Sequence, residues 1–282
     1  MPLTILGFKP SKLILVQRFV AKLLLYLFRI NGQTRWGNEF IQAIDQTVTI
    51  NNPIDSNQQL RFRTGHGRLY WRSVEALSIE PETNELIKNM GETDIFYDIG
   101  SNVGVYSLMA AQLRSVRTFS FEMELMNCSI QHQNIHLNQL QSLITLIPFA
   151  LSETRSVRSV YFKDISPGDA LHSIDAPSPA LDMKRKLKTI GSSILTFSLD
   201  EIVESFDLPM PTILKLDVDG VELNILKGAK RCLQMVRKLM VEVDEHSELN
   251  IKNYLYSHGF TTFTEYRSHN VKTNNRNILF CK

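Results

Sequence analysis

The stretch DIFYDIGSNVGVYSLMAAQL, residues 94–113, joins a short apolar run to a glycine-containing turn and a helix-forming run. The run IFYDI has the length and the aromatic and β-branched content of a buried strand. Gly100 and Gly104 mark the turn, and a helix is expected to begin near Val105. A strand that leads through such a turn into a helix is typical of open α/β sheets, which bind ligands outside the carboxyl ends of their strands.

Strand-like and helix-like segments continue to alternate after this unit. In chain order they read TFSFE, MNCSIQHQNIHL, LITLIPF, TILKLDV, VELNILKGAKRCL, KLMVEV and IKNYLYSHG. Alternation of this kind predicts a mostly parallel sheet with helices on both faces, a doubly wound α/β fold.

Three regions differ in composition. Residues 1–32 form an N-terminal amphipathic basic helix in our interpretation, because no acidic residue precedes Glu39. Residues 33–90 are expected to be a β-rich extension with the short strands QTVTI, QLRFR and RLYWRSV. Residues 91–282 form the α/β domain, with an insertion at about 152–198 that contains prolines and a basic run. An excursion of this length is expected to be a surface insertion or a cover over a binding site.

The predicted N-terminal helix has one basic stripe and a wide apolar face. Its longest apolar run, residues 23–28, is too short to span a bilayer. The apolar face is expected to pack on protein, while homo-oligomer formation or peripheral membrane contact through residues 11–30 remains an alternative.

Charge and cysteine content exclude several classes of protein. With 31 Lys plus Arg against 29 Asp plus Glu, the net charge is +2, so no nucleic-acid partner is expected. Cys128, Cys232 and Cys281 are odd in number and far apart, which argues against a disulfide framework or a thiolate zinc site and favours a cytoplasmic protein. His132 and His136 have zinc-pair spacing but lack the glutamate of the H-E-x-x-H motif, so no metal site is predicted.

A carboxylate at the end of the next strand indicates the kind of ligand. Glu122 ends TFSFE, a position that suits a ribose diol. A dinucleotide fingerprint is incomplete, because its second and third glycine positions hold Asn102 and Val105, which disfavours NAD. S-adenosylmethionine needs fewer glycines, and Asp98 and backbone groups are expected to hold its amino-acid end.

Two further strands end in charged residues. In TILKLDVDG, Lys215 and Asp217 point to the same side and Asp219 continues their row. An ion pair between Lys215 and Asp217 is one interpretation, and a polar site in the crevice is the one we favour. Glu222 follows directly, and KLMVEVDEH brings His246 toward the same rim.

These blocks together resemble the FkbM-type family of S-adenosylmethionine-dependent methyltransferases, from about Gly91 to the C-terminus. DIGSNVGVYS, residues 98–107, is similar to the family pattern D-x-G-A-N-x-G-x-x-S. Phe121 and Glu122 match F-E-P, and the helix that follows ends in the N-x-x-x-N pair. KLDVDGVELNILKG, residues 215–228, resembles K-x-D-V-E-G-x-E-x-x-V-L-x-G.

The resemblance implies a seven-stranded, mostly parallel Rossmann-like sheet and O-methylation of a hydroxyl on a sugar, glycan, lipid or secondary metabolite. Met123 departs from the family proline, and Asp219 stands where the family has glutamate. A nicotinamide oxidoreductase, or a non-catalytic membrane-associated protein that retains the fold, remains an alternative, as does a divalent ion on the carboxylates. The expected cofactor-binding residues are Asp98, Gly100, Asn102, Gly104, Glu122, Met123 and Ala150. The expected catalytic residues are Lys215, Asp217, Asp219, Glu222 and His246.

Overall fold

The computed structural model describes residues 47–64, 67–75, 80–162, 166–170, 172–175, 190–267 and 275–282, together with Val20, Leu23 and Tyr26. The chain divides into two units, Met1–Gln46 and Thr47–Lys282. The three described residues of the first unit are helical. The rest of the predicted N-terminal helix and the basic run at 184–188 lie outside the described residues, so the membrane or subunit contact of 11–30 stays a prediction. Every helix among the described residues is too short or too polar to span a bilayer.

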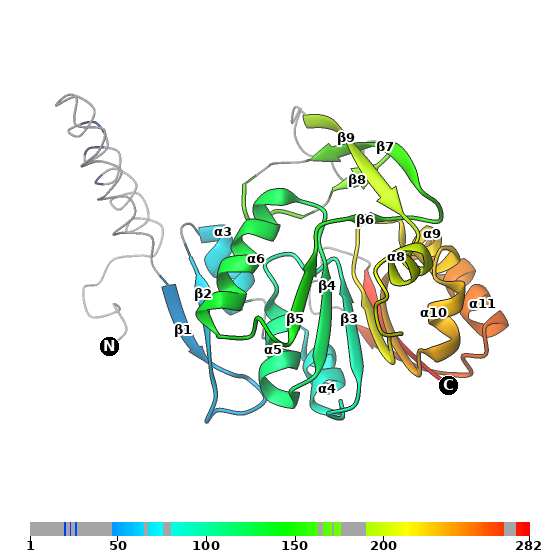
Figure 1. Cartoon of the computed structure of the whole chain (residues 1–282), viewed down its shortest axis with the longest axis horizontal. Helices are drawn as coiled ribbons and strands as arrows, with labels where there is room; N and C mark the ends of the chain where they lie inside the picture. The colour runs from blue at the N-terminus through cyan, green and yellow to red at the C-terminus, as the bar shows by residue number, and fades with distance from the viewer. Residues whose placement is uncertain are drawn as a thin grey trace. The chain divides into compact units, whose positions relative to one another are not determined.

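Within the described ranges, seven strands form one sheet in the order β12-β13-β11-β10-β3-β4-β5 (Figure 1). The parallel strands are β3 (Ile95–Ile99), β4 (Arg117–Phe121), β5 (Ile144–Ile147), β10 (Ile213–Leu216) and β11 (Lys238–Val243). β13 (Arg276–Cys281) runs antiparallel to both of its neighbours, β11 and β12 (Thr262–Arg267), so β12 points in the same direction as the parallel strands. The predicted seven-stranded, mostly parallel sheet is confirmed.

Helices cover both faces of the sheet, because side chains alternate along each strand. Phe96, Ile213 and Met240 share one buried cluster with α4 (Pro81–Lys88), α5 (Val105–Arg114) and α6 (Leu125–Leu137). Tyr97 and Leu214 point to the opposite cluster, whose helices are α8 (Leu199–Ser205), α9 (Glu222–Lys227), α10 (Lys230–Met235) and α11 (Glu248–Ser257). Each fully buried side chain of this size contributes about 1.5 to 3 kcal/mol. Burial of these two apolar layers therefore fixes the face of the sheet to which each strand side chain points.

The insertion adds a second, smaller sheet with the order β6-β9-β7-β8 (Figure 1). Its strands are β6 (Ala150–Leu151), β7 (Ser156–Phe162), β8 (Ser173–Ile174) and β9 (Ile190–Phe197). The central pair, β7 and β9, is antiparallel over seven residues. The insertion therefore has an ordered scaffold that can hold the loop between β7 and β8.

The extension before residue 90 is only partly β-structured. QTVTI and QLRFR form the antiparallel strands β1 (Thr47–Asn51) and β2 (Gln59–Arg63), as predicted. RLYWRSV was expected to be a strand and is helical, in α3 (Gly67–Tyr70) and the wider turn η2 (Trp71–Glu75). Leu69 and Ser73 are buried while Trp71 is exposed, which is a four-residue spacing rather than an alternation of two.

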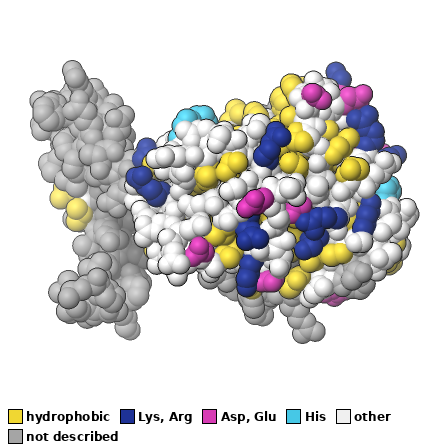
Figure 2. Space-filling view, turned by 60° about the horizontal axis from the view of Figure 1, so that its bottom comes forward, with side chains coloured by type: hydrophobic (Ala, Val, Ile, Leu, Met, Phe, Trp, Pro, Cys, Tyr) yellow, Lys and Arg dark blue, Asp and Glu magenta, His cyan; other side chains and the backbone are white. Residues whose placement is uncertain are grey.

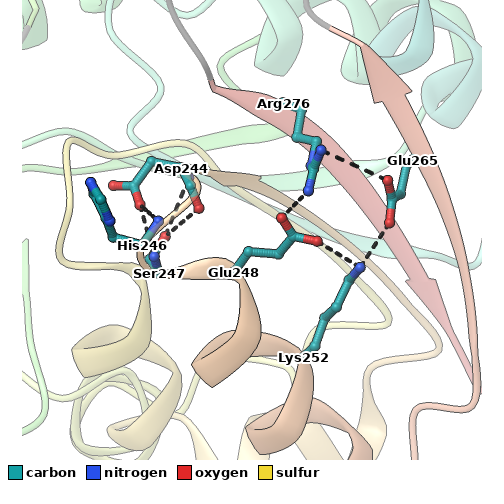
Figure 3. A network of polar contacts seen from close by, with 7 residues as sticks. All are labelled: Asp244, His246, Ser247, Glu248, Lys252, Glu265 and Arg276. Carbon is teal, nitrogen blue, oxygen red and sulfur yellow. Dashed lines mark hydrogen bonds and ion pairs between the residues drawn. The ribbon is translucent and has the colours of Figure 1, made fainter.

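A network of four charged side chains joins α11 to the antiparallel edge of the sheet (Figure 3). Lys252 Nζ lies 2.7 Å from Glu248 Oε1 and 2.7 Å from Glu265 Oε1. Arg276 pairs with Glu248 and lies 4.0 Å from Glu265. These contacts connect the N-terminal turn of α11 with β12 and β13.

Replacing Lys252 by methionine is expected to lower the free energy of unfolding by at most about 1 kcal/mol, because several members of the network contact solvent. The loss should shrink in high salt, which screens exposed charges. Chemical denaturation at two ionic strengths measures it, with the exposed Lys230→Met as control. A loss that does not change with salt would mean that lost packing of the side chain, rather than charge, stabilises this edge.

Candidate functional site

A pocket lies at the carboxyl ends of β3, β4 and β10, where the sequence predicted a ligand crevice. Its empty volume is about 660 Å³, which includes space that is open to solvent. Seven predicted site residues line it: Gly100, Asn102, Glu122, Met123, Ala150, Asp217 and Asp219. One pocket is therefore lined both by predicted cofactor-binding residues and by predicted catalytic residues.

The turn after β3 requires glycine at its first position. Gly100 has φ of +84°, and a Cβ placed there would lie 1.9 Å from the backbone oxygen of Asp217. The N–H groups of Gly100 and Ser101 donate to the Phe121 carbonyl at 3.0 Å each. The turn therefore contacts the ends of both β10 and β4. Because Gly100 has no side chain, its backbone is directly accessible from the pocket.

Glu122 is held at the pocket wall by backbone donors. Its Oε2 accepts from the N–H of Asn102 at 2.8 Å, and its Oε1 accepts from the N–H of Glu124 at 2.7 Å. Burial raises the pKa of Glu122 to about 7. Each carboxylate oxygen has a second lone pair, so the group can still accept two hydroxyl donors from a ligand.

Two predicted cofactor residues, Asp98 and Gly104, do not reach the pocket wall. Asp98 is 2% exposed and accepts from Ser107 Oγ at 2.5 Å. Burial raises its pKa, against the opposing effect of the Lys215 ammonium. Gly104 begins α5 with φ of +87° and packs on the side chain of Gln131. As on any strand, the Asp98 side chain points from a face of the sheet and not from its end. Asp98 and Gly104 therefore contact the junction of the turn with α5 rather than the pocket.

Lys215 and Asp217 satisfy both interpretations offered from the sequence. Lys215 is 2% exposed and its Nζ lies 2.5 Å from Asp217 Oδ2, so the ion pair exists. Asp217 also lines the pocket, and its side chain is 31% exposed although it pairs with a buried ammonium. Burial alone would raise the pKa of Asp217, but the adjacent ammonium holds it below its ordinary value. Asp217 is therefore an ionised carboxylate at neutral pH.

The remaining two predicted catalytic residues lie elsewhere. Glu222 is buried at the start of α9, where it accepts from the Gly220 N–H at 3.1 Å, and burial raises its pKa to about 8. His246 is exposed in the turn before α11, where Asp244 accepts from its backbone N–H at 2.7 Å (Figure 3). His246 was expected at the pocket rim and does not line the pocket, because β11 ends at Val243 and the turn that follows leads into α11.

The insertion covers the pocket, as one of its two expected roles required. Asp169, Ala170, His172 and Ile174 line the pocket together with residues of the glycine turn. Asn102 Nδ2 donates to the Asp169 carbonyl at 2.8 Å, and the His172 N–H donates to Asp219 Oδ2 at 3.1 Å. Arg68 in α3 pairs with the Asp169 carboxylate at 2.9 Å. The predicted site residues Asn102 and Asp219 thus hold the cover in place.

Sequence reasoning did not single out the residues that attach this cover. Asn127, in the first turn of α6, accepts from the Gly168 N–H at 2.7 Å and donates to the Asp169 carbonyl at 3.3 Å. The Pro167-Gly168 pair was the available signal for a turn here. Nothing in the periodicity of the segment indicated which of its side chains would face the pocket.

The site suits a nucleoside with a polar tail. Phe121, Phe149 and Val218 provide apolar walls, Glu122 provides two acceptors, and the bare backbone at Gly100 permits close approach.

Within the described ranges no group of three or more histidine, cysteine or acidic residues is arranged to hold a metal ion. Figure 2 shows basic and acidic side chains interspersed over the described part of one face of the molecule.

Comparisons with known proteins agree with this geometry. The family model described as the methyltransferase FkbM domain matches residues 63–262. Its match begins inside β2, so α3, η2 and α4 lie within the family domain, ahead of the expected start near Gly91. Hexuronic acid methyltransferase AglP of Haloferax volcanii is 29% identical over 190 residues, which cover 67% of this chain and 72% of that protein.

Solved methyltransferases are also similar. The crystal structure of methyltransferase FkbM from Methylobacillus flagellatus has a TM-score of 0.49 at 17% identity, covering 68% of this chain and 44% of that one. The METTL16 methyltransferase domain has a TM-score of 0.45 at 14% identity, covering 74% and 67%. The match of the family model over residues 63–262 shows that this chain belongs to the FkbM methyltransferase domain family.

Proposed function

We propose that the protein is an S-adenosylmethionine-dependent O-methyltransferase whose acceptor is a hydroxyl group of a sugar, with a uronic acid as the first candidate. The observation that carries the proposal is one pocket lined by Gly100, Glu122, Asp217 and Asp219 together. Membership of the FkbM family supports methyl transfer. The named activity of the relative AglP supports a sugar acid as acceptor.

The cofactor end of the pocket fits S-adenosylmethionine better than a dinucleotide. Glu122 would accept from the ribose hydroxyls, and the apolar side chains around it would hold the adenine. Asn102 and Val105 occupy positions where a pyrophosphate-binding turn has glycine. S-adenosylmethionine supplies an electrophilic methyl group when bound.

Residues at the part of the pocket that would bind the acceptor orient its hydroxyl group and accept the proton of that group. Asp217 accepts a hydrogen bond from the acceptor hydroxyl and takes its proton as the acceptor oxygen gains the methyl group. Lys215 keeps the carboxylate ionised before the reaction. Holding the two reacting atoms about 3 to 3.5 Å apart contributes roughly 7 to 11 kcal/mol to lowering the barrier. The cover from the insertion excludes water from this end.

Incubation with labelled S-adenosylmethionine and separate pools of uronic acids, neutral sugars, lipids and small metabolites tests the proposal. Transfer of label to a uronic acid or another sugar is the expected result. Asp217→Asn should lower kcat by about 10²- to 10⁴-fold, because the proton acceptor is lost. The exposed Asp207→Asn is the control. Label that enters no sugar pool, or full turnover by Asp217→Asn, would contradict the assignment.

A further inference from the structure

A row of ionisable side chains crosses one face of the sheet directly behind the pocket. Asp98 pairs with Lys215 in the register of β3 and β10, and Lys215 pairs with Met240 in the register of β10 and β11. Two residues further along these parallel strands come Asp217 and Glu242. Residues two apart point to the same face and neighbouring strands lie about 4.8 Å apart, so Asp217 and Glu242 are side by side.

Helix α4 brings another carboxylate to this row. Glu80, the residue before α4, has its Oε2 3.7 Å from Lys215 Nζ. The buried Thr83 hydroxyl donates to the same oxygen at 3.0 Å, which fixes the Glu80 side chain. Lys215 also lies 5.0 Å from the centre of the Tyr106 ring. The Lys215 ammonium is therefore paired with two carboxylates, those of Glu80 and Asp217.

The charges of this cluster do not balance if every carboxyl group is ionised. Four carboxyl groups, Glu80, Asp98, Asp217 and Glu242, surround the ammonium of Lys215, and the Arg72 guanidinium is the second positive charge that acts on Asp217. Several unpaired negative charges cannot be buried together without a large free-energy penalty, so some of these groups must hold protons.

Glu242 is the member best placed to be neutral. Burial, with the Asp217 carboxylate beside it, raises the pKa of Glu242 to about 9. A hydrogen bond from Glu242 to Asp217 helps to keep the pKa of Asp217 low. The charged groups that face Glu242 are Lys215 from β10, Asp217 and Asp219 from the segment after β10, and Glu80 from the residue before α4. The neutral Asn277 pairs with Glu242 in the register of β11 and β13.

We propose that Glu242 is a positioning residue of the site: as a neutral acid, it donates a hydrogen bond to the Asp217 carboxylate. Lys215, which also pairs with Glu80, donates to the same carboxylate. The inference rests on the proposed function. With two donors fixing it, the Asp217 carboxylate presents its remaining lone pairs to the pocket. The proton of the acceptor hydroxyl moves to Asp217 during transfer, and Glu242 keeps its own proton throughout.

Two substitutions at one position separate this role from others. Glu242→Gln keeps a donor beside Asp217, so kcat should fall by no more than about threefold, whereas Glu242→Leu removes the donor and should lower kcat by roughly 10- to 100-fold. The KM for the cofactor should change little in either variant. Glu245→Gln, an exposed neighbour in the next turn, is the control. If Glu242→Gln were as inactive as Glu242→Leu, Glu242 would act as an ionised base and the proposal would be overturned.

The pH profile gives a second readout that loss of packing would not produce. In the wild type, kcat should fall as pH rises through about 9, because ionised Glu242 then repels the Asp217 carboxylate. Glu242→Gln cannot ionise, so this alkaline decline should disappear. An alkaline decline that persists unchanged in Glu242→Gln would contradict the assignment.

Infrared difference spectra test the protonation of Glu242 without any acceptor. The wild type minus Glu242→Gln spectrum should contain the carbonyl band of a protonated carboxyl at pH 7, and this band should vanish above about pH 9. An ionised Glu242 at pH 7 overturns the inference even if methyl transfer is demonstrated. A protein that shows the band but methylates no acceptor would refute the proposed function instead.

Discussion

Replacing Gly100 by alanine is expected to be the most damaging single change in the turn. An alanine would have to adopt φ of +84° and place its Cβ 1.9 Å from the backbone oxygen of Asp217. A left-handed conformation costs about 1 to 2 kcal/mol, and displacement of the β10 end adds to it, so a loss of roughly 2 to 4 kcal/mol is expected. This corresponds to a fall in melting temperature of about 5 to 15 °C. Binding of S-adenosylhomocysteine should be lost as well, because the turn and Asp217 move together.

Gly220→Ala provides a matched control for this prediction. Gly220 has φ of +90°, but its Cβ would meet nothing within 4 Å. Only the conformational cost of about 1 to 2 kcal/mol is therefore expected at this position. Thermal unfolding and calorimetric titration of both variants make the comparison. Equal effects at the two positions would show that the contact between Gly100 and β10 is not important.

Replacing Glu122 by alanine is expected to remove most of the affinity for the cofactor. Two hydrogen bonds from ribose hydroxyls to a charged group are worth about 1.5 to 3 kcal/mol each. Their loss should raise the Kd for S-adenosylhomocysteine by roughly 10²- to 10⁴-fold. Calorimetric titration measures this, with the exposed Glu153→Ala as control. Unchanged affinity in Glu122→Ala would contradict the placement of the ribose at the end of β4.

The affinity should also depend on pH in a defined direction. Burial raises the pKa of Glu122 to about 7, so part of the free protein carries a neutral side chain at pH 7. Hydroxyl donors favour the ionised form, so binding should release protons and affinity should rise with pH until about 7, then level off. Titrations in buffers of different ionisation enthalpy measure the released protons, and Glu122→Ala should release none from this position.

Local sequence was sufficient to predict the sheet and one side of the site. Gly100, Glu122 and Asp217 could be placed at the pocket because they come directly after apolar strands, and parallel strands place their carboxyl ends at one edge. The same reasoning failed for His246, which comes three residues after its strand. A turn of that length can lead in several directions, and the hydrogen bonds from His246 and Ser247 to Asp244 fix the direction that was taken.

The N-terminal extension shows the same limit. RLYWRSV has residues compatible with a strand, but contacts with the cover of the pocket stabilise it as a helix. Arg72 Nε donates to the Gly168 carbonyl at 3.2 Å, and Arg68, four residues earlier, pairs with Asp169. On a helix, residues four apart are neighbours on one face, about 5 to 6 Å apart, so both can reach the same short segment. Single-sequence periodicity contains no information about that partner.

By itself, the sequence determined the alternation of strands and helices from β3 to α11 outside the insertion, the glycine turn at residue 100, and the carboxylates that follow β4 and β10. These properties depend on backbone conformation and on the alternation of side chains over a few residues. Only the tertiary structure decided that the insertion closes the pocket and that Glu80 and Glu242 complete the surroundings of Lys215 and Asp217. Such contacts join segments far apart in the chain, and burial in a shared low-dielectric environment, rather than any local pattern, sets their charges.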